Sequence, residues 1–166
     1  MNHHPHEHEV FFDLPQREQL EAFDQHRAML AASLDGLTED EARRSLVPSR
    51  TTLLGLVKHA AFVEWVWFDE AVTGRSRAEI MIPATPDESF LLAPHDTIAS
   101  VLAGHQFACT ASRAAVATLG LDDVVTGNRR GALPLRWVLM HVLRELAQHA
   151  GHADILCEQV LAARDV

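Results

Sequence analysis

Apolar residues recur at intervals of three, four and seven positions along four long stretches of the chain. These stretches cover residues 15–36, 51–74, 96–120 and 134–160. This spacing brings the apolar side chains onto one face of a helix, where they can pack against other helices. Thr51 or Thr52 can cap the second helix and Asp96 the third. Pro134 suits the first turn of the fourth. The pattern therefore predicts four long helices.

Shorter segments connect the four stretches. Thr38 and Glu41 have the spacing of a capping box, which predicts a short helix over residues 39–45. The segment 74–94 contains three prolines and is expected to be a crossover connection without a long helix. A connection of this length in a compact domain is often functional or covers a site. A second loop is expected over residues 122–133.

An all-α four-helix bundle with a long crossover loop is the economical architecture for four such helices. The chain has 166 residues, 48% of them hydrophobic and 6% aromatic, which is typical of one domain built from packed helices. Residues 15–166 are expected to form this single domain. Residues 1–14 are expected to be a flexible tail that binds metal weakly at most. The tail carries His3, His4, His6 and His8.

The overall charge excludes some classes of partner. Lys and Arg total 14 against 23 Asp and Glu, so the formal charge of −9 repels the phosphates of nucleic acid. No apolar run is long enough for a membrane span and no secretory signal is visible, so we expect a cytoplasmic protein. Cys109 and Cys157 are far apart in helical patterns and are expected to be free thiols that pack in the core.

One group of residues has the pattern of a metal site. Glu145 and His149 are four residues apart, which puts both on one face of the fourth helix. His59, on the second helix, could supply a third ligand. Three ligands leave coordination positions open for water or substrate, as catalytic metal sites require. The alternative interpretation is that His59 is an ordinary core histidine and that Glu145 and His149 lie on a solvated helix face.

Several neighbouring residues have open roles at this stage. His141 and His152 continue the stripe of Glu145 and His149, so any three of these residues could bind, or one could orient a ligand. Glu64 lies well round the second helix from His59 and is expected to be exposed or to support a ligand. Trp65 and Trp67 are interpreted as packing residues. Four arginines could hold an anionic substrate but could equally be ordinary surface residues. They are Arg27, Arg129, Arg130 and Arg136.

Two blocks of sequence resemble the DinB-like superfamily of metal-binding four-helix bundles. The first runs from Leu46 to Trp65 and the second from Leu135 to Asp154. The resemblance extends over about residues 17–160 and is nearest to an actinobacterial branch of unknown function. It implies an up-down-down-up bundle and a possible homodimer. Cys157 departs from this branch, which usually has Arg at that position.

The resemblance also implies a site and a chemistry. The superfamily holds a divalent ion with one His from the second helix and two ligands four apart on the fourth, and the matching positions are His59, Glu145 and His149. The mycothiol-dependent maleylpyruvate isomerases of this superfamily use His, Glu and His. His152 falls where the wider superfamily commonly has Gln, so it is assigned a supporting role. The implied cosubstrate is a small thiol, such as mycothiol or bacillithiol.

These observations lead to a functional hypothesis. Two imidazoles and one carboxylate suit Zn²⁺ first, with Ni²⁺, Fe²⁺ and Mn²⁺ as alternatives. The first hypothesis is a metal-dependent S-transferase or isomerase that acts on a small molecule with a low-molecular-weight thiol. The alternatives are a metal-dependent small-molecule hydrolase and a stress-response module that binds metal or ligand without turnover. No general base and no substrate can be identified from the sequence.

Overall fold

The computed structural model of the chain describes residues 15, 18 and 24–164. The histidine-rich tail predicted for residues 1–14 and the start of the predicted first helix therefore lie outside the described residues. Within the described part, no helix is both long enough and apolar enough to cross a membrane.

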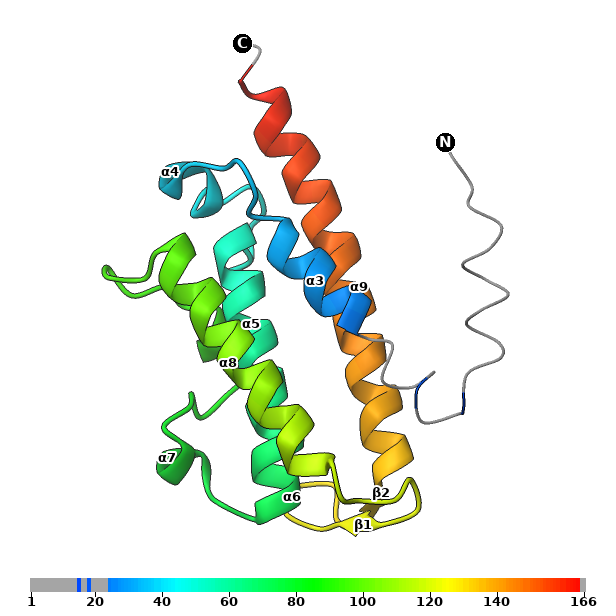
Figure 1. Cartoon of the computed structure of the whole chain (residues 1–166). Coiled ribbons are helices and arrows are strands. Elements are labelled where there is room, and N and C mark those ends of the chain that lie inside the picture. The colour runs from blue at the N-terminus through cyan, green and yellow to red at the C-terminus, as the bar shows by residue number, and fades with distance from the viewer. Residues whose placement is uncertain (1–14, 16–17, 19–23, 165–166) are drawn as a thin grey trace.

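Four long helical segments build the molecule, which confirms the all-α bundle (Figure 1). They are α3 (Asp24–Ala32), α5 (Leu53–Trp65), α8 (Ile98–Val116) and α9 (Leu135–Ala162). The helix α5 continues through a π-helical segment, η1 (Val66–Glu70), into α6 (Ala71–Thr73), and ends at Gly74 in the left-handed conformation. In Figure 1, α3 and α9 run in one direction and α5 and α8 in the other. This is the up-down-down-up order.

The helix starts follow the predicted capping chemistry at α4 and α5 but not at α8 and α9. Pro134 was expected in the first turn of the fourth helix, but it is the N-cap residue, and α9 begins at Leu135. The hydroxyl of Thr52 accepts a hydrogen bond from the backbone N–H of Gly55 and caps α5. Thr38 and Glu41 form the predicted capping box at α4 (Glu39–Ala42), which ends three residues earlier than expected. The prediction that Asp96 caps the third helix was wrong, because Thr97 is the cap. The Asp96 carboxylate instead accepts hydrogen bonds from the Lys58 ammonium and the backbone of Ala93.

The two predicted loops contain short elements. The crossover carries α7 (Arg77–Ile80) and a 3₁₀ turn, η2 (Glu88–Phe90), which packs against α5. The second loop contains β1 (Val124–Val125) and β2 (Leu133–Pro134), which pair antiparallel with Val124 opposite Pro134. Sequence periodicity did not predict this pair, because two-residue strands are too short to show alternation.

One apolar core holds the helices together. Leu30 of α3, Leu56 of α5, Val101 of α8 and Leu146 of α9 are among its buried members. Burying each such leucine stabilises the fold by roughly 1.5–3 kcal/mol relative to exposure. The helix α5 packs on both α8 and α9, and α3 packs on α9. The helix α5 is thus the central element, and side chains on different faces of it reach different neighbours.

Two polar residues lie in this core in a way that contradicts the sequence prediction. Glu64 was expected to be exposed or to support a metal ligand, but its side chain is fully buried. Both of its carboxylate oxygens accept hydrogen bonds from the guanidinium of Arg27, at 2.8 and 2.6 Å. Arg27 is itself buried and cannot hold a substrate. A buried charge is tolerated when it is paired and hydrogen-bonded, which explains why these two residues can occupy the core.

Candidate metal centre

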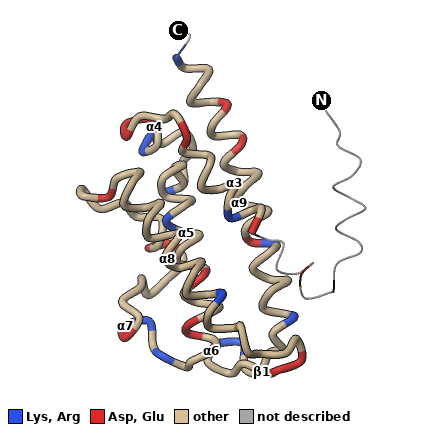
Figure 2. Tube along the Cα trace, viewed as in Figure 1, with Lys and Arg blue, Asp and Glu red and all other residues tan. Residues whose placement is uncertain are grey.

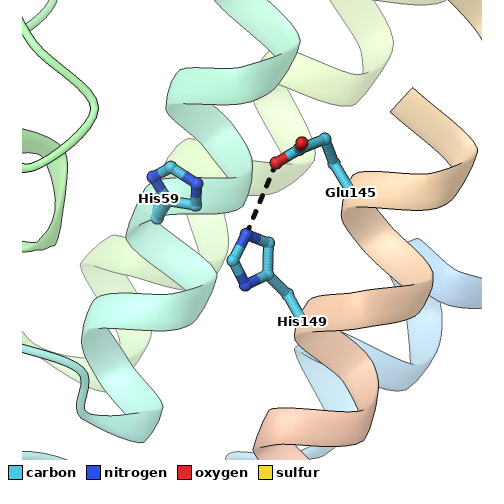
Figure 3. A group of neighbouring side chains, drawn as sticks. All are labelled: His59, Glu145 and His149. Carbon is cyan, nitrogen blue, oxygen red and sulfur yellow. Dashed lines mark ion pairs between the residues drawn. The ribbon is translucent and has the colours of Figure 1, made fainter. Parts of the chain in front are cut away.

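The structure brings together the three side chains selected from the sequence. His59 lies in the middle of α5, while Glu145 and His149 project from consecutive turns of α9 toward it (Figure 3). One ligand atom from each residue lies within 4.8 Å of the others. The Nε2 atom of His149 is 3.7 Å from Oε2 of Glu145. Two ligands of a tetrahedral Zn²⁺ are about 3.4 Å apart, so small adjustments would let one ion bridge these groups.

His59 is held in the form that a metal ligand needs. Its Nδ1 atom is 2.6 Å from Oγ of Ser89. The Ser89 hydroxyl donates its own hydrogen to the carbonyl oxygen of Pro86. Because that hydroxyl has only one hydrogen, it accepts from His59, which places the imidazole proton on Nδ1. The Nε2 atom then keeps its lone pair. Metal-binding histidines are commonly oriented by such a bond to the other ring nitrogen.

Burial also favours the neutral form of His59. The ring stacks on Phe90 with centroids 4.0 Å apart, and the side chain is only 4% exposed. Burial, reinforced by the nearby His149, lowers the pKa of His59 to about 4, although the carboxylate of Glu145 opposes this shift. The imidazole is therefore neutral at neutral pH, which is the form that coordinates metals.

Glu145 lies between two histidines. Its Oε2 faces His149, and its Oε1 is 3.8 Å from Nε2 of His141. Interaction with His149 lowers the pKa of Glu145, with further contributions from His141 and His59, against burial, which raises it. The carboxylate is therefore ionised at neutral pH and supplies a hard, negatively charged ligand beside two neutral nitrogens.

His149 is oriented by ring contacts. Its imidazole meets His59 edge to face, with centroids 4.8 Å apart, and also contacts Phe90 and His152. The Nδ1 atom of His149 is buried and has no hydrogen-bond partner within the described residues. The ring thus lies in a water-poor place where its other nitrogen, Nε2, faces Glu145. The donor set of this cluster fits a divalent ion and leaves coordination positions open.

The two alternative histidines on α9 lie beside this cluster. His141 stacks on Trp137, with centroids 5.0 Å apart, and meets the edge of Trp67. Burial lowers the pKa of His141, while Glu145 opposes the shift. His152 is exposed, and its ring contacts His149 at 5.7 Å between centroids. Within the described residues the only potential ligand cluster is the group of His59, Glu145 and His149.

A cavity of about 260 Å³ opens beside the three candidate ligands. His59, His141 and Glu145 form one wall of it. The π-helical segment η1 supplies part of another wall through Val66, Trp67 and Glu70. π-Helical turns widen a helix locally and are frequent at functional sites. The cavity is large enough for a small molecule next to the candidate metal position.

The structure also corrects several residue assignments made from the sequence. Trp67 belongs to the buried core and packs on Trp137, as expected, and it also lines the cavity. Trp65 packs on Phe107, as expected. Arg129 and Arg130 line the cavity, whereas Arg136 does not and pairs with Asp122. Sequence reasoning missed Ser89 and Arg77. Their only signal was the length of the crossover, which indicated a functional segment but no particular residue.

Comparison with known proteins identifies the fold and the family of the chain. A crystal structure of the mycothiol-dependent maleylpyruvate isomerase, solved on a histidine-to-alanine mutant, matches with a TM-score of 0.60. The match covers 93% of this chain and 70% of that chain at 19% identity, and at so low an identity it shows a common fold. No curated protein matches the sequence. The family model described as mycothiol-S-transferase matches residues 19–162. The chain therefore belongs to the mycothiol-S-transferase family.

Proposed function

We propose that this protein is a divalent-metal-dependent S-transferase or isomerase that joins a low-molecular-weight thiol to a small electrophile. Mycothiol is the first choice of thiol because of the family, and bacillithiol is the alternative. The observation that carries the proposal is the cluster of His59, Glu145 and His149, in which His59 and Glu145 also line a cavity. A set of three leaves room at the metal for a reactant.

Zinc is the proposed metal, with nickel, iron and manganese as alternatives. A divalent ion at this position supplies Lewis acidity, which lowers the pKa of a thiol so that thiolate is available at neutral pH. His59, Glu145 and His149 would hold the ion. His59 is fixed by Ser89, and Glu145 compensates part of the positive charge. Phe62, Val66 and Trp67 form the apolar walls.

The cysteines of the chain are poor candidates for the nucleophile, which favours an external thiol. Burial raises the pKa of Cys109 to about 12 and also raises the pKa of Cys157. The thiol of Cys157 donates a hydrogen bond to the carbonyl oxygen of Ser33. Neither cysteine lines the cavity. A thiolate in this site must therefore come from a cosubstrate.

The test is cobalt substitution of the purified full chain. We expect one Co²⁺ per chain, an absorption spectrum that changes when mycothiol is added, and consumption of mycothiol in the presence of 1-chloro-2,4-dinitrobenzene. The variants His59→Ala, Glu145→Ala and His149→Ala should lose the metal. His152→Ala, one turn further along α9, is the matched control and should retain it.

Other outcomes would favour the alternative functions. Metal retained at full stoichiometry in the three alanine variants would rule out the ligand assignment. A tight metal with no response to mycothiol or bacillithiol, combined with ester hydrolysis, would point to a hydrolase that uses the same open position for water. A tight metal with neither response would leave a binding module.

A further inference from the structure

The cavity beside the candidate metal centre has a second polar wall made of arginines. Arg129 and Arg130 come from the loop between β1 and β2, and Arg77 comes from α7. They line the same cavity as His59, His141 and Glu145. Figure 2 shows Lys and Arg segments beside α6 and α7 at this end of the bundle. In a chain with a formal charge of −9, such a local excess of positive charge is unexpected.

The loop that carries these arginines is held tightly against the end of the second long helix. The backbone N–H of Gly127 donates to the carbonyl oxygen of Ala71 at 3.0 Å. A Cβ atom at position 127 would lie 2.1 Å from the carbonyl oxygen of Glu70 and 2.8 Å from Cα of Gly74. Both of these neighbours are backbone atoms that cannot swing away. Only glycine permits this close approach, which keeps the loop packed against the backbone of Glu70 and Gly74.

Internal hydrogen bonds then shape the loop. The side-chain oxygen of Asn128 accepts from the backbone N–H of Arg130 at 2.8 Å, and its amide nitrogen donates to the carbonyl oxygen of Gly131 at 2.9 Å. Gly131 has a φ of +86°, which suits glycine. An asparagine that bonds its own backbone in this way stabilises a turn. The two arginines are therefore presented from an ordered turn.

The guanidinium groups differ in what they already bind. Arg77 donates to the carboxylate of Glu70 at 2.9 Å and to the carbonyl oxygen of Ala84, so its charge is largely compensated. Arg129 donates to the carbonyl oxygen of Ala84 at 3.3 Å. Arg130 lies over the ring of Trp137, 5.6 Å from its centroid. Neither Arg129 nor Arg130 has a carboxylate partner within the part of the chain that the structure describes.

The geometry points to a subsite for a carboxylate, and we propose that Arg129 and Arg130 bind the carboxylate of a reactant whose apolar body lies along Phe62 and Trp67. Guanidinium groups bind carboxylates through paired, charge-assisted hydrogen bonds. The carboxylate belongs either to the electrophile or to the thiol. This inference names a substrate class for the site and rests on the proposed function for its chemical context.

Binding measurements on the full chain test this subsite without turnover. The probes are 4-chloro-3-nitrobenzoate and its neutral amide, 4-chloro-3-nitrobenzamide, titrated by calorimetry into metal-free and zinc-loaded protein without thiol. We expect the benzoate to bind about tenfold more tightly than the amide, as a charge-assisted hydrogen bond allows. The double variant Arg129→Gln/Arg130→Gln should lose this preference. Arg50→Gln/Arg136→Gln removes the same charge outside the cavity and should keep it.

A second pair of probes identifies which reactant carries the carboxylate. N-acetylcysteine and its amide are titrated into the zinc-loaded protein in the same way. A preference for N-acetylcysteine that depends on Arg129 and Arg130, with no preference between the benzoate and its amide, would support the subsite and assign it to the thiol. Equal affinities within both pairs, or a preference that survives the double variant, would overturn the proposal.

Gly127 provides an independent check through the loop. Gly127→Ala should weaken benzoate binding as strongly as the double arginine variant, because the loop must move away from Glu70 and Gly74. Circular dichroism will show whether Gly127→Ala loses helical structure. In that case the arginine variants alone test the subsite. Suppose that metal-free protein binds the benzoate, but that protein loaded with any of the candidate metals does not respond to mycothiol or bacillithiol. This result would support the subsite and refute the proposed thiol chemistry.

Discussion

The bundle contains two polar clusters that are built on buried residues five positions apart in α5 and that differ in how their charged groups are paired. Glu64 of α5 is fully buried, and both of its oxygens are bonded to Arg27 of α3. His59 of the same helix lies close to Glu145 and His149 of α9, and the side chains of His59 and Glu145 line a cavity. The first cluster is closed by a partner of opposite charge. The second is left open.

The pairing of the charged groups distinguishes a structural cluster from a candidate functional one. Arg27 also bonds Asp24, which in turn pairs with Arg113 of α8, so the first cluster forms a continuous ion-pair network. A network whose members are mutually satisfied has no remaining capacity for a ligand. In the second cluster the closest approach of Glu145 to either histidine is 3.7 Å, which is too long for a hydrogen bond. An unsatisfied group of ligand atoms next to a cavity is a candidate site.

The largest expected effect is on stability, at the closed cluster. Arg27→Met leaves the Glu64 carboxylate buried without its partner and should lower the free energy of unfolding by about 3 to 5 kcal/mol. Adding Glu64→Leu should restore most of this loss, because the buried charge is removed as well. Urea denaturation measures both. If Arg27→Met is as stable as the wild type, the ion pair contributes nothing to stability. Zinc affinity should be unchanged in the Arg27→Met/Glu64→Leu double variant.

At the open cluster the expected effect is on metal affinity. Glu145→Gln removes the charged ligand and should weaken zinc binding at least about hundredfold, which exceeds the usual loss for a supporting residue. The metal-free protein should change in stability by less than about 1 kcal/mol, because Glu145 has no hydrogen-bonded partner in the core. Competition with a chelator measures the affinity. The control is Glu158→Gln, an exposed carboxylate further along α9.

The pH dependence of the stability of the metal-free protein tests the burial of His59 in the open cluster. The pKa of His59 is about 4 in the folded chain, against 6.5 for an ordinary histidine, so the unfolded chain binds the proton more readily. Stability is therefore complete above pH 6.5 and declines as pH falls toward 4, by on the order of 2 to 3 kcal/mol from this residue. In His59→Gln that part of the decline should disappear. An unchanged pH profile would contradict the assignment.

The smallest effect concerns the residue that supports His59. Ser89→Ala removes the hydrogen bond that holds the imidazole proton on Nδ1 and should weaken zinc binding about 10- to 100-fold. Zinc affinity is measured beside that of Ser100→Ala, which alters an exposed serine at the start of α8. Equal affinities in the two variants would show that packing against Phe90 alone orients the ring. A larger loss of zinc affinity in Ser89→Ala than in Glu145→Gln would show that Ser89 matters more for binding than the proposed ligand.

Much of the fold was predictable because helical patterns are local. The spacing of apolar residues predicted four helices. The capping box of Thr38 and Glu41 predicted the start of α4, and Thr52 was one of the two residues predicted to cap α5. The errors arose where a tertiary contact competed with a local preference. Asp96 is a good capping residue, but its carboxylate accepts a hydrogen bond from Lys58 of α5, and Thr97 caps α8. Arg27, from another helix, makes the burial of Glu64 possible.

The four long helices, the spacing of Glu145 and His149, and the choice of His59 as a third ligand could be read from the sequence, and the family resemblance agreed with that choice. These depend on residues that are neighbours along a helix, whose geometry is nearly invariant. The packing of the whole chain determines that Ser89 orients His59, that Trp67 lines a cavity and that Arg129 and Arg130 line the same cavity as His59 and Glu145. These contacts join different elements of the fold, and the one between Ser89 and His59 spans 30 residues. Their distances depend on how the whole chain packs, which no local pattern encodes.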